Sequence, residues 1–114
     1  MSTEYYRKHG MNFPDRMALE VHKLVAERLL TDDDNAIRLA NSNIDRWIKK
    51  GAYPSSFTEW IEILNTYNIE KIRQIILAED DKGQDLRSKS PFVGVISDSE
   101  RQSCIDLCVA LGLE

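Results

Sequence analysis

Apolar residues recur every three to four positions along most of this chain, which is the spacing of one face of an α-helix. The first such stripe follows Pro14 and Asp15, so we place the beginning of the first helix there, with Asp15 as its N-cap. In chain order, the apolar stripes are Met17, Val21, Leu24, Val25 and Leu29; Ile37, Ala40, Ile44, Trp47 and Ile48; Phe57, Trp60, Ile61 and Leu64; Ile69, Ile72, Ile75 and Ile76; and Cys104, Ile105, Cys108 and Leu111. The pattern predicts an all-α chain.

Capping residues set the expected limits of the later helices. Carboxylates suit the positive end of a helix, so the second helix is expected to begin at 31–32, and Gly51 is expected to end it. The segments 56–59 and 97–100 both have the Ser-x-x-Glu spacing of a capping box, and they are predicted to open the third and the last helix. Asn68 is the predicted N-cap of the fourth helix.

Two shorter segments complete the picture. A short helix is expected over about 80–88, and an apolar connector follows at 91–96. That connector is the only segment rich in β-forming residues, and a single short strand would have nothing to pair with. We therefore expect an all-α fold, a single compact irregular bundle of five or six helices over 13–114. Residues 1–12 are polar and are expected to form a loosely ordered N-terminal segment.

Composition and cysteine usage agree with one ordinary globular domain. The chain has 114 residues, of which 42% are hydrophobic and 30% are charged. No apolar run approaches the roughly 20 residues that span a bilayer, and the start lacks the apolar region of a secretion signal, so no membrane contact is expected. Cys104 and Cys108 are spaced as neighbours on one helix face, where two buried thiols are favoured over a disulfide or half a metal site. We therefore expect a cytoplasmic protein.

Charge is unevenly distributed along the chain. The net charge is −4, yet residues 35–55 carry four basic side chains against Asp45 alone. These basic residues are Arg38, Arg46, Lys49 and Lys50. Residues 56–114 carry eleven acidic and six basic side chains. Because nucleic-acid affinity depends largely on neutralising phosphates, an acidic chain with one small basic helix face is an unpromising nucleic-acid binder.

The segment 44–64 resembles the recognition helix and the following helix of phage-repressor-type helix-turn-helix proteins. In that family an alanine lies about ten residues before the position of Ile44, and a glycine of the tight turn lies about six before it. Here those positions hold Asp34 and Arg38. Because these two positions depart from the family pattern, a DNA-binding regulator that uses the four basic residues is the alternative hypothesis and not the leading one. It requires a break in the second helix at 41–43. The apolar spacing instead favours one continuous helix.

A second resemblance concerns the tail of the chain. The segment reads Leu86-Arg87-Ser88-Lys89-Ser90-Pro91-Phe92-Val93-Gly94-Val95-Ile96-Ser97, followed by Glu100-Arg101. It resembles a pattern of small helical bacterial proteins, Leu-Arg-x-x-Ser-Pro-Phe-x-Gly-Val-Leu-Ser and then Glu-Arg. Those proteins also carry an Arg-Trp and a Glu-Trp pair, matched here by Arg46-Trp47 and Glu59-Trp60. The resemblance implies a binding role beside toxin–antitoxin or related operons, and it assigns no catalytic residue.

The connector 91–96 can be interpreted in two ways. Pro91 pushes the preceding residue toward extended geometry, and Gly94 permits a tight bend or a close backbone approach. The favoured interpretation is a loop that buries Phe92 across the open end of the bundle. The alternative is an exposed apolar edge that docks a partner through Phe92, Val93, Gly94 and Val95.

The sequence contains no recognisable catalytic, metal or cofactor constellation. His9 and His22 are the only histidines, and neither lies at metal-ligand spacing from Cys, Asp or Glu. The leading hypothesis is therefore a non-enzymatic protein-interaction module without cofactors, an antitoxin-like or regulatory partner of a bacterial effector. Its acidic residues Glu59, Glu62, Asp80 and Asp81 would complement a basic surface on a protein partner. The identity of that partner and homodimer formation stay open.

Overall fold

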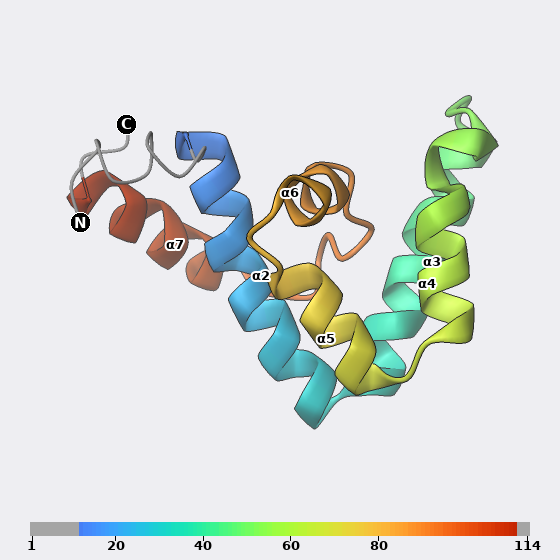
Figure 1. The fold of residues 1–114 in the computed structure, drawn as a ribbon, viewed down its shortest axis with the longest axis horizontal. Coiled ribbons are helices and arrows are strands. Elements are labelled where there is room, and N and C mark those ends of the chain that lie inside the picture. The colour runs from blue at the N-terminus through green and yellow to red at the C-terminus, as the bar shows by residue number, and fades with distance from the viewer. Residues whose placement is uncertain (1–11, 112–114) are drawn as a thin grey trace.

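Six α-helices and one 3-10 turn make up most of residues 12–111, which are the residues that the computed structural model describes (Figure 1). In chain order they are α2 (Phe13–Thr31), α3 (Asp33–Lys49), η1 (Pro54–Phe57), α4 (Thr58–Thr66), α5 (Ile69–Leu77), α6 (Asp81–Ser88) and α7 (Asp98–Ala110). No strand occurs within this range, and the all-α prediction is confirmed. Of the predicted N-terminal segment 1–12, all but Asn12 lies outside the described residues.

The starts of two helices differ from those predicted. Asn12, not Asp15, caps α2, because its Oδ1 atom accepts from the backbone N–H of Asp15 at 3.1 Å and Pro14 lies within the first turn. The capping box predicted at 56–59 does not form. Pro54 opens the turn η1, which leads directly into α4, so Ser56 lies inside that turn rather than at a helix cap.

Other predicted helix ends are confirmed. Asn68 caps α5 by accepting from the N–H of Lys71 at 2.9 Å. Ser97 and Glu100 form the reciprocal capping box that opens α7. The second helix, α3, follows α2 after Asp32 and runs unbroken to Lys49, and Gly51 adopts a φ of 108° just beyond it.

Helix α2 is the central element of the fold. It packs against α3, α5, α6 and α7. In Figure 1 the pair α3 and α4 lies on one side of α2 and α5, and α7 lies on the other. The main core lies between α2, α3, α4, α5 and the connector, and its most deeply buried members include Val25, Ala40, Trp60, Ile72 and Ile76.

A smaller cluster joins the two ends of the chain that the structure describes. Met17 of α2 packs with Cys104 and Cys108 of α7. Both cysteines are buried free thiols, as predicted, and burial raises the pKa of each above its ordinary value. These thiols therefore act as small apolar groups that hold α7 against α2.

Candidate functional site

The connector that follows α6 is held in place by buried polar contacts. Asn43 of α3 is 2% exposed, and its Nδ2 atom donates to the carbonyl oxygens of Pro91 at 2.9 Å and Val93 at 2.8 Å. Its Oδ1 atom accepts from Arg46 at 2.8 Å. Because one amide group satisfies two carbonyls of a segment about fifty residues away, the connector has a defined path across the bundle.

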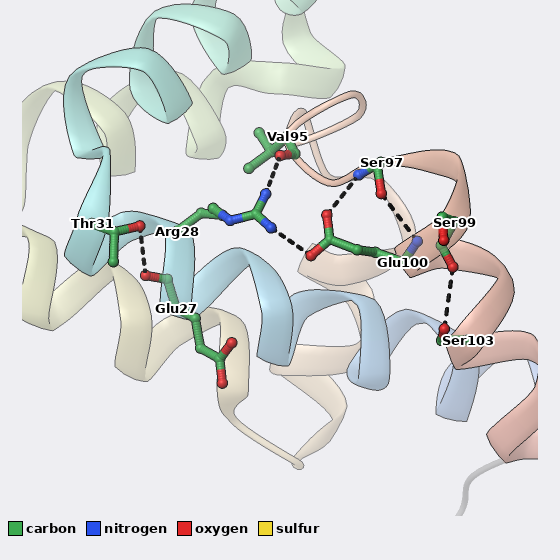
Figure 2. A network of polar contacts seen from close by, with 8 residues as sticks. All are labelled: Glu27, Arg28, Thr31, Val95, Ser97, Ser99, Glu100 and Ser103. Atoms are coloured by element: carbon green, nitrogen blue, oxygen red, sulfur yellow. Dashed lines mark hydrogen bonds and ion pairs between the residues drawn. The ribbon is translucent and has the colours of Figure 1, made fainter.

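A second contact fixes the far end of the connector. Figure 2 shows Arg28 of α2 reaching the carbonyl oxygen of Val95 at 3.2 Å and the carboxylate of Glu100. The same carboxylate accepts from the N–H of Ser97, and these bonds hold the pKa of Glu100 below its ordinary value. Arg28 therefore ties the N-terminus of α7 to the last turn of α2.

The partner-binding residues predicted on this connector divide by exposure. Phe92 is 3% exposed, and it makes edge-on contacts with the rings of Trp60, at a centroid distance of 5.6 Å, and His22, at 6.5 Å. The predicted burial of Phe92 is confirmed. Val93 is 60% exposed, Gly94 is exposed with a φ of 88°, and Val95 is half-buried. The solvent-facing part of the connector is thus reduced to Val93 and Gly94.

The predicted acidic residues gather around a different surface. A groove of about 390 Å³ lies between α4, α5 and α6, with Ile63, Ile75 and Leu86 among its apolar lining. Glu59, Glu62 and Asp80 line the same groove, whereas Asp81 is exposed at the start of α6 and does not. The structure therefore brings three of the four predicted carboxylates together.

Close packing of α6 shapes this groove. A Cβ atom at position 83 would collide with the backbone oxygen of Ala78, so only glycine allows α6 to approach the end of α5 this closely. Asp80 caps α6 by accepting from the N–H of Gly83 at 2.8 Å. Lys82 lies 2.6 Å from Glu59, which raises the pKa of Lys82. Within the part of the chain that the structure describes, Glu62 forms no ion pair.

Of the four basic residues proposed for DNA binding, three lie on one unbroken helix, α3, and Lys50 is its C-cap. No turn interrupts α3 at 41–43, and the continuous helix that the apolar spacing favoured is confirmed. Arg38, Arg46, Lys49 and Lys50 are all exposed. Three of them contact neighbours on the same helix, namely Asn35, Asn43 and Asp45. The helix-turn-helix arrangement that the alternative requires is therefore missing from this segment.

A second cavity, which was not predicted from the sequence, lies between α2, the end of α6, the connector and α7. Its volume is about 700 Å³, and its lining includes His22, Ser90, Phe92 and Arg87. His22 is 4% exposed, and its Nδ1 lies 2.7 Å from the carbonyl oxygen of Ala18. Because a carbonyl oxygen only accepts, Nδ1 carries the proton and Nε2 accepts from the hydroxyl of Ser90, also at 2.7 Å.

In the Ser90–His22 pair the hydroxyl donates to the imidazole, as the serine of a hydrolase donates to its histidine base. The surroundings of the pair differ from those of a hydrolase. A backbone carbonyl, and not a carboxylate, orients the imidazole. Burial lowers the pKa of His22 to about 4, so the ring is a weak base at neutral pH. Ser90 also accepts from the N–H of Phe92 at 3.2 Å. The pair therefore joins the connector to α2 through a chain of neutral hydrogen bonds.

No protein-family model, curated protein or solved structure matches this chain. Among residues 12–111, no helix is long and apolar enough to cross a membrane. The same residues contain no group of three or more His, Cys, Asp or Glu side chains arranged to hold a metal ion.

Proposed function

We propose that this protein is a non-enzymatic interaction module whose α4–α5–α6 groove receives a basic, partly apolar segment of a protein partner. The observation that carries the proposal is the convergence of Glu59, Glu62 and Asp80 around one apolar-floored groove. Apolar contact would supply affinity there, and the carboxylates would select the charge and register of the partner.

Side chains around the groove support this assignment. Tyr67, the C-cap residue of α4, lines the groove and is 41% exposed, and the aliphatic side chain of Ile75 lines it too. Aromatic and aliphatic side chains beside a charged rim are typical of interface centres. Two lysines, Lys71 and Lys82, also line the groove. A basic segment that displaces Lys82 from Glu59 would exchange one exposed ion pair for another, which costs little.

Site-specific photocrosslinking in the native host tests this proposal. A photoreactive phenylalanine analogue replaces Tyr67 in one variant and Tyr53 in a matched control. Tyr53 is 79% exposed and does not line the groove. We expect a discrete crosslinked protein at position 67 and none at position 53.

Charge reversal supplies a second comparison for the same experiment. Glu62→Lys should reduce the crosslinking yield at position 67, because it places a cation where the partner presents one. Glu27→Lys changes an exposed glutamate of α2 outside the groove and should leave the yield unchanged. Equal yields at positions 53 and 67, or equal effects of the two reversals, would refute the groove as the binding surface.

The resemblance of the 86–97 segment supports a bacterial effector as the partner, with this chain as its antitoxin-like or regulatory subunit. Co-expression with the neighbouring reading frame should yield a complex whose crosslink at position 67 maps to a basic segment. The DNA-binding alternative has less support because α3 is continuous. Salt-sensitive binding to upstream DNA that is lost in Arg46→Ala and Lys49→Ala would reinstate it.

A further inference from the structure

Every sulfur-bearing side chain among residues 12–111 lies in one small buried cluster. These side chains are Met17 of α2 and Cys104 and Cys108 of α7. Met17 is 8% exposed, Cys104 is 6% exposed and Cys108 is fully buried, and both cysteines are free thiols. One thioether and two thiols therefore meet where α7 lies against α2 (Figure 1).

The two cysteines have a spacing that allows one ion to bridge them. Residues four apart on an α-helix have Cβ atoms about 5–6 Å apart on the same face. A metal–thiolate bond is about 2.3 Å long, so a shared ion requires sulfur atoms no more than roughly 4.6 Å apart. Side-chain rotation of Cys104 and Cys108 can reach this separation without a change in the backbone of α7. Met17 packs on them from α2 and brings a third sulfur to the same place.

The surroundings of the sulfur cluster favour a soft ion over a hard one. The side chains packed around it are apolar, namely Phe13, Val21, Leu24 and Ile105. A hard cation such as Mg²⁺ requires oxygen ligands and usually keeps several waters, which an apolar shell excludes. Zn²⁺ prefers four ligands in a tetrahedron. Thiolate and thioether ligands instead select Cu⁺, so the type and number of the donors indicate that ion.

Charge does not select the ion, because both signs lie near the thiols. Arg16 and Lys23 act on Cys108 with positive charge, and Arg101 acts likewise on Cys104. The buried carboxylate of Glu20 opposes them at both cysteines, and Glu100 does so at Cys104. Burial keeps both thiols protonated when no metal is bound, so an ion binds only by displacing those protons.

We propose that Met17, Cys104 and Cys108 form a binding site for one Cu⁺ ion, with two thiolates and one thioether as its ligands. One Cu⁺ and two thiols give an anionic complex and two released protons, with no change in oxidation state. Because its ligands come from α2 and α7, the ion ties these two helices together. The site is separate from the α4–α5–α6 groove and does not depend on the proposed partner.

Competition for Cu⁺ tests this site. The reduced protein is titrated without oxygen against the Cu⁺ complex of bathocuproine disulfonate, whose colour reports the Cu⁺ that the chelator retains. We expect one Cu⁺ per chain, with only sulfur ligands in X-ray absorption. Because the three ligands are brought together only in the folded chain, Cu⁺ should also raise the melting temperature. Zn²⁺ should bind more weakly under the same conditions.

Three variants test the geometry. Cys108→Ala removes one thiolate and should abolish tight binding. Met17→Leu keeps a buried apolar side chain of similar size, and it should weaken Cu⁺ binding by roughly tenfold or more and cancel the rise in melting temperature. The matched control combines Cys108→Ala with Ser103→Cys, which keeps two thiols but moves one to an exposed position of α7. It should bind Cu⁺ no better than Cys108→Ala.

Several outcomes would overturn the proposal. They are the lack of one-to-one Cu⁺ binding, equal affinity in the control with the relocated thiol, and tighter binding of Zn²⁺ than of Cu⁺. Unchanged affinity in Met17→Leu, or Cu⁺ binding without a rise in melting temperature, would overturn the three-sulfur site between the two helices. If Cys108→Ala fails to fold, Met17→Leu and the X-ray absorption of the unaltered protein still decide the question.

Discussion

The α4–α5–α6 groove and the cavity beside the connector (the connector cavity) differ in how their polar groups are held. Around the α4–α5–α6 groove the carboxylates and lysines lie at the surface, and the Glu59–Lys82 pair is largely solvent-exposed. Beside the connector, His22, Arg87 and Asn43 are each at most 4% exposed. Exposed ion pairs contribute little to stability, whereas buried polar groups are costly when a partner is lost. Ion pairs at the groove can therefore be exchanged with little loss of stability. The structure around the connector cavity depends on its buried hydrogen bonds.

The largest effect is expected on the buried face of the connector. Phe92→Ala should lower the free energy of unfolding by about 3–5 kcal/mol, because it removes an aromatic ring from between Trp60 and His22. Val93→Ala, at the neighbouring position that is 60% exposed, should leave stability nearly unchanged. Denaturant unfolding of both variants measures the difference. Similar losses in the two would show that the connector is not anchored by its phenylalanine.

Acid should lower the free energy of unfolding through His22, which lines the connector cavity. Its folded-state pKa of about 4 lies below the ordinary value of 6.5, because burial disfavours the charged ring. Between these values the unfolded chain binds a proton that the folded chain does not, so stability is full above pH 6.5 and falls as the pH drops toward 4. The loss attributable to this group approaches about 3 kcal/mol.

Unfolding free energies measured across this pH window would check that expectation. His22→Gln should flatten the slope, whatever its stability at neutral pH. A ring titration followed by magnetic resonance should give a midpoint well below 6.5. A midpoint at the ordinary value would contradict the burial of a neutral imidazole.

An intermediate effect is expected where α3 holds the connector. Asn43→Ala removes the donor to the carbonyls of Pro91 and Val93, which should cost about 1–3 kcal/mol in unfolding free energy. Asn41→Ala is the control, since Asn41 is half-buried and donates to Ile37, a carbonyl of its own helix. Equal effects of the two variants would argue against a special role for Asn43.

The smallest effect is expected at the groove. Glu59→Gln removes the partner of Lys82 and should lower stability only slightly at low ionic strength. The difference from the unaltered protein should disappear in high salt, because screening weakens exposed charge pairs. Thermal unfolding at two salt concentrations measures this. A large loss of stability in Glu59→Gln that persists in high salt would mean that the groove, like the connector cavity, depends on this polar contact for its stability.

Local sequence signals predicted the helices well and some of their ends poorly. Asn68 and the Ser97–Glu100 box cap helices as predicted because each cap involves residues only three positions apart. Ser56 has the same spacing but fails, because Pro54 begins a 3-10 turn before the helix can start. Asp15 fails as a cap because Pro14 is accommodated within the first turn of α2, so the cap moves back to Asn12.

The candidate sites were predictable only in part. Acidic residues scattered between 59 and 81 indicated a charged surface, yet their convergence depends on the close approach of α6 to α5 at Gly83. His22 and Ser90 are 68 positions apart, and no periodicity relates them. Arg87 lies in the short helix predicted over about 80–88, and no sequence signal marked this arginine as buried.

The sequence by itself determined that this protein is built from helices and where most of them lie, and it favoured the burial of Phe92 over its exposure. Those properties follow from the spacing of apolar side chains and from caps made between near neighbours. Only the tertiary structure decided that α2 brings His22 to Ser90, that Asn43 holds the connector, and that Arg87 is buried with its Nε and Nη2 atoms unpaired. Each of these contacts requires side chains from distant segments to meet in a desolvated space, where their energies are set by packing and not by local sequence.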